Sequence, residues 1–129
     1  MDDILERVTE LALEKYCCAQ IVMAIGLEML DKDNPDLIRA MKGMCHGVCT
    51  YRFCGTLAAA ACVLSLYHEH YSSVLIPELV RWFEDRYGSV TCFNITEGKI
   101  DMSRCLKITA DTCMRCFELI EENRLVGDE

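Results

Sequence analysis

Proline and strand-like patterns are scarce in this chain of 129 residues, which contains two prolines. A sheet needs runs in which apolar and polar side chains alternate, and such runs are almost missing. Apolar residues instead recur at helical spacing. The sequence therefore predicts an all-α bundle of about five helices, over residues 3–30, 35–44, 54–70, 76–87 and 101–124.

Positive charge and long apolar runs are also lacking. The net charge of −8 argues against a nucleic-acid partner, because few cations are available to neutralise phosphates. The longest apolar stretch, residues 53–67, is shorter than the roughly 18 to 20 residues that a membrane span requires. No secretory leader pattern opens the chain. We therefore expect one cytoplasmic domain over residues 1–129 that does not contact a membrane.

Two stretches of the expected bundle carry strong patterns. In residues 3–30 an apolar stripe includes Cys18 and is broken only by Lys15. Cys17 would point about 100° away from Cys18 around the same helix. Residues 53–67 are apolar on nearly every side, which predicts a helix buried at the centre of the bundle.

Cysteine is what the chain has in excess, at ten residues. Cysteine-rich chains are commonly small secreted disulfide scaffolds, but a chain of this length can bury a core without cross-links. In a reducing cytoplasm such thiols are more often metal ligands or redox-active groups than structural bridges. A cysteine can also act as a small hydrophobe, which is our interpretation of Cys62 in an alanine-rich stretch.

Some cysteines stand at spacings that bring their sulfurs together. Cys45 and Cys49 are four residues apart and would share a helix face, near glycines that allow the backbone to fold around a site. Cys113 and Cys116 form a Cys-x-x-Cys pattern within an expected helix. We regard these four as secondary candidates for metal ligands. Cys105 precedes Cys116 by nearly three helical turns, so these two would share a face.

The familiar cofactor and catalytic motifs are missing. Phe117 follows the Cys-x-x-Cys pattern where covalent haem attachment needs histidine, and zinc-ribbon and ferredoxin spacings do not occur. His46 could join thiolates as a mixed ligand, although a loop histidine more often faces solvent. There is no phosphate-binding glycine loop, nucleophile elbow or acid/base pair. We therefore expect no independent catalytic activity.

Four stretches carry motifs that belong together. Residues 15–20 read Lys-Tyr-Cys-Cys-Ala-Gln, and residues 54–59 read Cys-Gly-Thr-Leu-Ala-Ala. Residues 83–92 contain Tyr-Gly-Ser at positions 87–89 and end at Cys92, and Cys105 opens the last expected helix. Together these stretches resemble the C-GCAxxG-C-C family of redox-active proteins, known from anaerobic bacteria. The second stretch departs from the family's Cys-Gly-Ala-x-x-Gly core at Thr56 and Ala59.

The resemblance implies a site. By this resemblance the family's four cysteines fall on Cys18, Cys54, Cys92 and Cys105. A similar domain in split-Soret cytochromes of sulfate reducers has an associated iron–sulfur cluster. The resemblance therefore implies that the four cysteines converge on an iron–sulfur cluster, in preference to a tetrahedral zinc ion. The six additional cysteines exceed the family pattern and suggest a second or altered site.

The implied function is that of a redox-active accessory protein in electron transfer or redox sensing. An acidic surface would suit transient docking on a basic redox protein partner, and the apolar stripes would also allow a homodimer. Two alternatives stay open, a non-catalytic interaction bundle and a metal-free thiol–disulfide relay. The candidate residues of the relay are Cys17, Cys18, Cys113 and Cys116.

Overall fold

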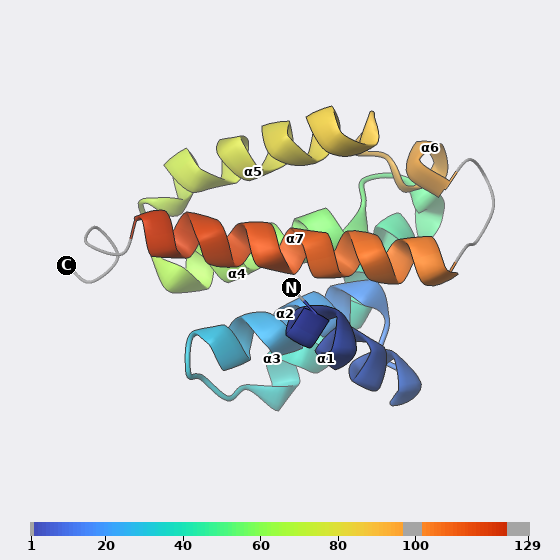
Figure 1. The fold of residues 1–129 in the computed structure, drawn as a ribbon, viewed down its shortest axis with the longest axis horizontal. Coiled ribbons are helices and arrows are strands. Elements are labelled where there is room, and N and C mark those ends of the chain that lie inside the picture. The colour runs from blue at the N-terminus through green and yellow to red at the C-terminus, as the bar shows by residue number, and fades with distance from the viewer. Residues whose placement is uncertain (1, 97–101, 124–129) are drawn as a thin grey trace.

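The computed structural model describes residues 2–96 and 102–123. Within these ranges the chain forms seven α-helices and two short helical turns, shown in Figure 1: α1 (Asp2–Leu13), α2 (Cys18–Met29), α3 (Pro35–Ala40), η1 (Met41–Met44), η2 (Gly47–Tyr51), α4 (Gly55–Tyr67), α5 (Ser72–Tyr87), α6 (Cys92–Thr96) and α7 (Met102–Glu122). The described residues contain no strand, only an isolated antiparallel bridge between Phe53 and Thr91. The all-α prediction is confirmed.

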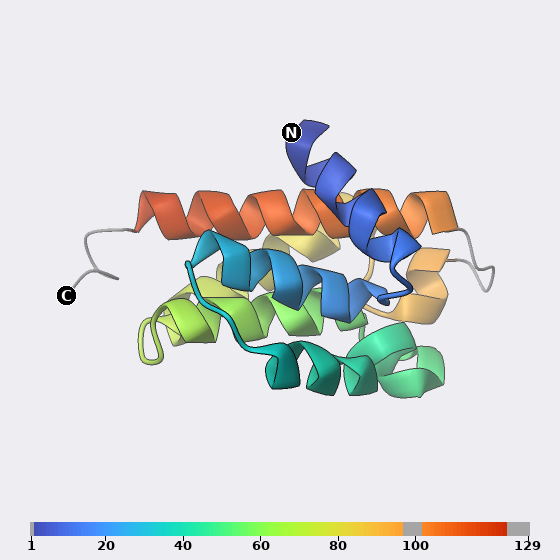
Figure 2. The same ribbon diagram turned by 90° about the horizontal axis from the view of Figure 1, so that it is seen from below.

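Helices α2 and α4 pack against each other at the centre of the bundle. Nine consecutive residues of α2, numbers 19–27, are buried, so the predicted central helix shares its place with a second one. The Val63 side chain of α4 packs directly against the backbone of α2 at Gly26, where an added Cβ would lie 2.8 Å from Val63 Cγ1. Helix α7 packs on both, α5 covers α4, and α1 crosses α7 (Figures 1 and 2).

The prediction of one continuous helix over residues 3–30 is wrong, because the chain turns sharply after Leu13. Lys15 adopts a left-handed backbone with φ of 72°, and the N–H of Tyr16 donates to the carbonyl of Leu11 at 3.3 Å. Lys15 is therefore not a defect in an apolar stripe. It lies in an exposed turn, after which Cys17 becomes the N-cap of a new helix.

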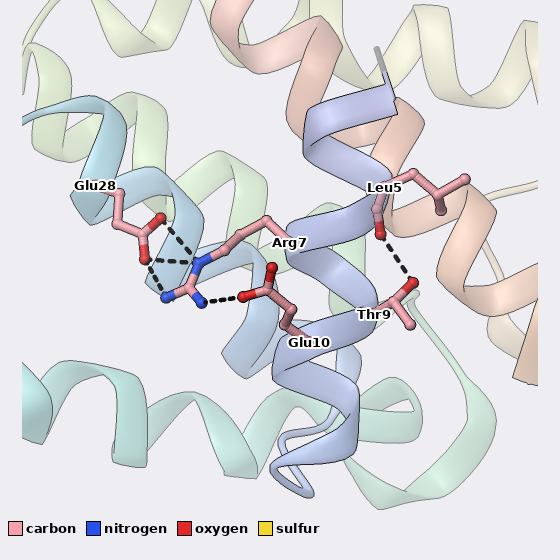
Figure 3. Close-up of polar contacts among 5 residues, drawn as sticks. All are labelled: Leu5, Arg7, Thr9, Glu10 and Glu28. Atoms are coloured by element: carbon pink, nitrogen blue, oxygen red, sulfur yellow. Dashed lines mark hydrogen bonds and ion pairs between the residues drawn. The ribbon is translucent and has the colours of Figure 1, made fainter.

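Outside the core, polar side chains link α1 to α2 (Figure 3). Arg7 donates to the Glu28 carboxylate from Nε at 3.1 Å and from Nη2 at 2.7 Å, and Nη1 donates to Glu10 at 3.1 Å. Glu28 raises the pKa of the Arg7 guanidinium above its ordinary value, chiefly through these hydrogen bonds. Because all three side chains are exposed to water, these contacts between α1 and α2 add little stability.

The later helices also differ from their predicted bounds. Helix α5 begins at Ser72, earlier than the predicted residue 76, so Pro77 lies inside it. The short helix α6 lies between the predicted helices 76–87 and 101–124, where the sequence predicted no helix. The predicted end residues of the last helix, Asp101 and Arg124, lie outside the described residues. In the described part of the chain, no helix combines the length and apolar content that a bilayer span would need.

Candidate functional site

Four helices begin at the same end of the bundle, and a cavity lies between their first turns. In both ribbon views the starts of α2, α4, α6 and α7 gather at this end (Figures 1 and 2). The cavity has a volume of about 390 Å³. The cysteines that line it are Cys17, Cys18, Cys54, Cys92 and Cys105. The structure thus brings the four cysteines marked by the family resemblance to one cavity.

The Cys-Cys-Ala-Gln segment forms the start of α2. The Gln20 side chain reaches back so that its Oε1 accepts a hydrogen bond from the Cys17 N–H at 3.2 Å. This bond satisfies a backbone donor that the helix start would leave without a partner. Cys18 follows in the first turn, half-buried beside the cavity.

Cys54 and Cys92 are aligned by backbone pairing on either side of the Phe53–Thr91 bridge. The N–H of Cys54 donates to the carbonyl of Val90 at 2.8 Å, and the N–H of Cys92 donates to the carbonyl of Arg52 at 2.6 Å. These reciprocal bonds hold the start of α4 beside the start of α6. They join residues far apart in the sequence, so helical spacing alone could not reveal them.

The Tyr-Gly-Ser motif forms the turn that leads into α6. Gly88 adopts a left-handed backbone with φ of 80°, a conformation that glycine takes without strain. The Ser89 hydroxyl then accepts from the N–H of Thr91 at 3.0 Å and lies 3.4 Å from the amide nitrogen of Asn94. The motif therefore sets the direction in which Cys92 enters the helix.

A pair of buried threonines connects the start of α4 to α7. The Thr109 hydroxyl donates to the carbonyl of Cys105 at 2.7 Å and lies 3.4 Å from the Thr56 hydroxyl. Thr56 is the residue that departs from the alanine of the family motif, and the departure supplies this contact. Ala59, the other departure, is fully buried in α4.

The thiols at the cavity influence one another electrostatically. Burial raises the pKa of Cys54 to about 11, and the neighbouring Cys18 and Cys92 thiols add to the rise. Backbone N–H groups of Leu57 and Thr56 partly oppose it, because Cys54 caps α4. Burial and Cys18 also raise the pKa of Cys92. Several thiolates here would repel one another unless a positive charge compensated them.

Cys113 and Cys116 lie elsewhere, in the core face of α7, and both are 1% exposed. The Cys116 thiol donates to the carbonyl of Ala60 at 3.7 Å. Burial raises the pKa of Cys116 to about 12, and burial also raises the pKa of Cys113. Such sealed thiols pack as small hydrophobes and are poorly suited to a dithiol relay. Cys105 and Cys116 were predicted to share one face of the last helix. In α7, Cys105 lines the cavity and Cys116 is buried in the core.

The remaining cysteines occupy separate environments. Cys62 is half-buried in α4, and burial raises its pKa. Cys49 is exposed in η2 with φ of 58° and does not line the cavity. His46, the possible mixed ligand, also has a left-handed backbone but does line the cavity, with its ring 5.9 Å from that of Tyr51.

One disulfide differs from the sequence-based expectation. Cys17 is bonded to Cys45, with 6.1 Å between their Cα atoms. In the relay alternative Cys17 and Cys18 could act as a dithiol, and Cys45 was a secondary candidate for a metal ligand. In the structure their sulfurs bind each other, across 28 residues of sequence. No local spacing pattern predicts this bond, because it joins residues that are far apart in the sequence. Cys17 follows the turn at Lys15, which the helical pattern also did not predict.

The cysteines line one cavity but do not form a tight cluster. Among residues 2–96 and 102–123, no three Cys, His, Asp or Glu side chains are gathered closely enough to be ligands of a single metal ion. The cavity wall also carries polar and charged groups from the neighbouring turns, including Lys15.

Comparison with known proteins gives one match. No curated protein and no solved structure shows significant similarity to the chain. A family model described as "Putative redox-active protein (C_GCAxxG_C_C)" matches residues 16–119, which is most of the chain and includes all five cysteines of the cavity. The chain therefore belongs to the C_GCAxxG_C_C family of redox-active proteins.

Proposed function

We propose that this protein is a cytoplasmic carrier or sensor of electrons that holds an iron–sulfur cluster in the cavity. The observation that supports the proposal is the convergence of four family cysteines, one from the start of each of four helices, on a single cavity. The proposed ligands are Cys18, Cys54, Cys92 and Cys105.

The residues at the cavity fit such a group chemically. Cysteine thiolates are the ligands of iron–sulfur clusters. A cluster is several atoms across, so its four thiolates stand farther apart than the ligands of one zinc ion. This spacing suits cysteines that line a cavity without forming a tight cluster. Burial, with a smaller contribution from the Cys18 and Cys92 thiols, raises the pKa of Cys54, and the positive charge of bound iron would favour its thiolate. A bound cluster would supply one-electron transfer.

The protein's own residues determine how accessible this centre is. Cys54 is buried and anchored by the backbone bond to Val90, whereas Cys18, Cys92 and Cys105 are only partly buried. The proposed centre thus lies near the surface, where a second protein can approach it. The net charge of −8 favours a redox partner with a basic surface.

The direct test is metal analysis of anaerobically purified protein. We expect iron and sulfide in comparable amounts, with a visible absorption band. The Cys54→Ser variant should lose both, and the Cys62→Ser variant is the matched control, because Cys62 lies on the same helix but does not line the cavity. Zinc without iron would mean that the cavity binds a zinc ion and not a cluster. Equal iron in the wild type and Cys54→Ser would reject these ligands.

The proposed partner interaction has a separate test. Electrostatic docking weakens as salt screens the charges, so the rate of electron exchange with a basic redox protein should fall between low and physiological ionic strength. An uncharged redox dye is the control, since its rate should change little. A salt-independent rate with the basic protein would argue against electrostatic docking.

A further inference from the structure

The Cys17–Cys45 disulfide lies at the edge of the cavity, although neither residue belongs to the four cysteines of the family pattern. Cys17 caps α2 immediately before Cys18, and Cys45 immediately follows η1. The bond therefore joins the start of a central helix to the segment that leads into η2. Its position beside the proposed cluster site suggests a role beyond cross-linking.

The two cysteines of this bond differ in accessibility. Cys17 is only half-buried and lines the cavity, whereas Cys45 is 1% exposed. A thiolate that enters the cavity can therefore reach Cys17 but not Cys45. Lys15 lines the same cavity and places a positive charge near the path of an incoming thiolate. The geometry selects Cys17 as the sulfur to be attacked and Cys45 as the leaving sulfur.

The surroundings also accommodate the reduced state. Cys45 Sγ lies 3.7 Å from the carbonyl oxygen of Met41, so a Cys45 thiol would find a hydrogen-bond acceptor in place. The start of α2 does not depend on the bond, because the Cys17 N–H is held by Gln20 Oε1. Breaking the disulfide therefore leaves the helix cap intact and does not strand a buried polar group.

We propose that Cys17–Cys45 is a reversible two-electron redox couple that exchanges with a dithiol reductant through the cavity. The reductant thiolate attacks Cys17 Sγ, the Cys17–Cys45 bond breaks, and the electron pair passes to Cys45 Sγ, which takes up a proton. The second thiol of the reductant then loses its proton and displaces Cys17 from the mixed disulfide. Cys17 Sγ is protonated in turn. The protein gains two electrons and two protons, and the dithiol becomes a disulfide.

This couple does not rest on the proposed cluster, because its atoms are different. A bound cluster would occupy the path of the incoming thiolate, so the couple is a two-electron function of the protein without the cluster. It also gives a role to two of the six cysteines that exceed the family pattern. The thiol–disulfide alternative raised by the sequence thus takes a different form, with Cys45 as the partner of Cys17 in place of Cys18 or the buried Cys113 and Cys116.

The test is a redox titration of the native, full-length protein under anaerobic conditions. The native protein is equilibrated with mixtures of reduced and oxidised dithiothreitol and quenched with acid. It is then unfolded without reductant, so that the buried Cys45 can also react, alkylated, and analysed by peptide mass spectrometry. We expect Cys17 and Cys45 to become alkylated together in one step, and the step to reverse when oxidised dithiothreitol is added. The Cys62→Ser control should keep the step, and Cys17→Ser and Cys45→Ser should each abolish it.

Two results would overturn the proposal. If the bond opens only after the protein is unfolded, it is a structural cross-link. If Cys17 and Cys45 alkylate at every dithiothreitol ratio, the bond does not form. The Cys54→Ser variant separates this inference from the cluster proposal: iron should be lost there while the Cys17–Cys45 step persists. A titration step that is missing in both the wild type and the iron-free Cys54→Ser variant, with iron present in the wild type, would reject the couple alone.

Discussion

Cys54 at the cavity and Cys116 in the core are both buried, and burial raises the pKa of both thiols. Their surroundings differ. Cys54 lies where several helix starts meet, within electrostatic reach of Cys18 and Cys92. Cys116 lies in the middle of α7, where its thiol donates to the carbonyl of Ala60. Burial alone therefore does not mark a functional cysteine. A position at the shared cavity distinguishes the candidate ligand Cys54 from the core residue Cys116.

The same contrast applies to the backbone around the two regions. The core is made of long helices in close contact, as at Gly26 and Val63. The cavity end is made of turns, including left-handed backbone at Lys15, His46 and Gly88. A turn can direct the first residue of a helix into a shared space, whereas a residue in mid-helix can only face its neighbours. The cavity end is thus the part of the fold where cysteines from distant segments can meet.

Single cysteine substitutions should give the largest difference between the two regions. Cys92→Ser or Cys105→Ser should lower the iron content by at least about tenfold, because each removes a proposed ligand. Cys113→Ala should keep the iron and destabilise the fold by about 1–2 kcal/mol through a small cavity in the core. Iron analysis and urea unfolding would measure the two effects. Iron loss in Cys113→Ala without loss of stability would contradict the assignment of Cys113 to the core and of the ligands to the cavity.

Two glycine substitutions should damage the two regions separately. A Cβ on Gly55 would lie 2.9 Å from the carbonyl carbon of Met44, whose backbone cannot yield as a side chain can, so Gly55→Ala should distort the cavity end. Gly26→Ala should clash with Val63 in the core and destabilise the fold by about 1–3 kcal/mol. Unfolding and iron content would be measured together.

The glycine experiment has two controls. Gly43→Ala should be neutral, because a Cβ there has no atom within 4 Å outside its immediate surroundings. Val63→Ala should restore part of the stability lost in Gly26→Ala, since it removes the clashing atoms. If Gly55→Ala leaves iron content and stability unchanged, the close approach at the cavity is not important to the site.

Alkaline pH should weaken the cluster-free protein through its buried thiols. The folded-state pKa values of Cys54 and Cys116, about 11 and 12, lie above the ordinary value of 9.0. Between these values the folded state retains protons that the unfolded chain releases, so stability should fall as pH rises above 9. Melting temperatures across this range should fall less steeply for Cys116→Ala. Parallel curves for the wild type and this variant would contradict the effect of burial.

The smallest effect is expected far from both regions. Arg7→Ala removes the exposed contacts to Glu28 and Glu10 shown in Figure 3. We expect a loss below about 1 kcal/mol in unfolding free energy and unchanged iron, because exposed ion pairs contribute little. A larger loss would mean that the contact between α1 and α2 helps to hold Cys17 and Cys18 at the cavity.

The sequence by itself determined the helical class and the identity of the candidate cysteines. Apolar periodicity is a local property, so it predicted helices over most of the observed ranges. It also predicted that residues 53–67 are buried, which holds for most of them. The Cys-Cys-Ala-Gln, Cys-Gly and Tyr-Gly-Ser motifs are also local, and each forms the start of a helix or the turn that precedes one.

Only the tertiary structure decided which cysteines meet. A cysteine in an apolar stripe fits a core, a helix cap or a ligand equally well, so spacing could not separate Cys105 from Cys116. The separation depends on contacts between distant segments, such as the Cys54 N–H bonded to Val90 and the Cys17–Cys45 bond. The turn at Lys15 is the clearest case: the sequence pattern favoured one long helix, but a charged side chain has little to gain from burial, and the chain turned there.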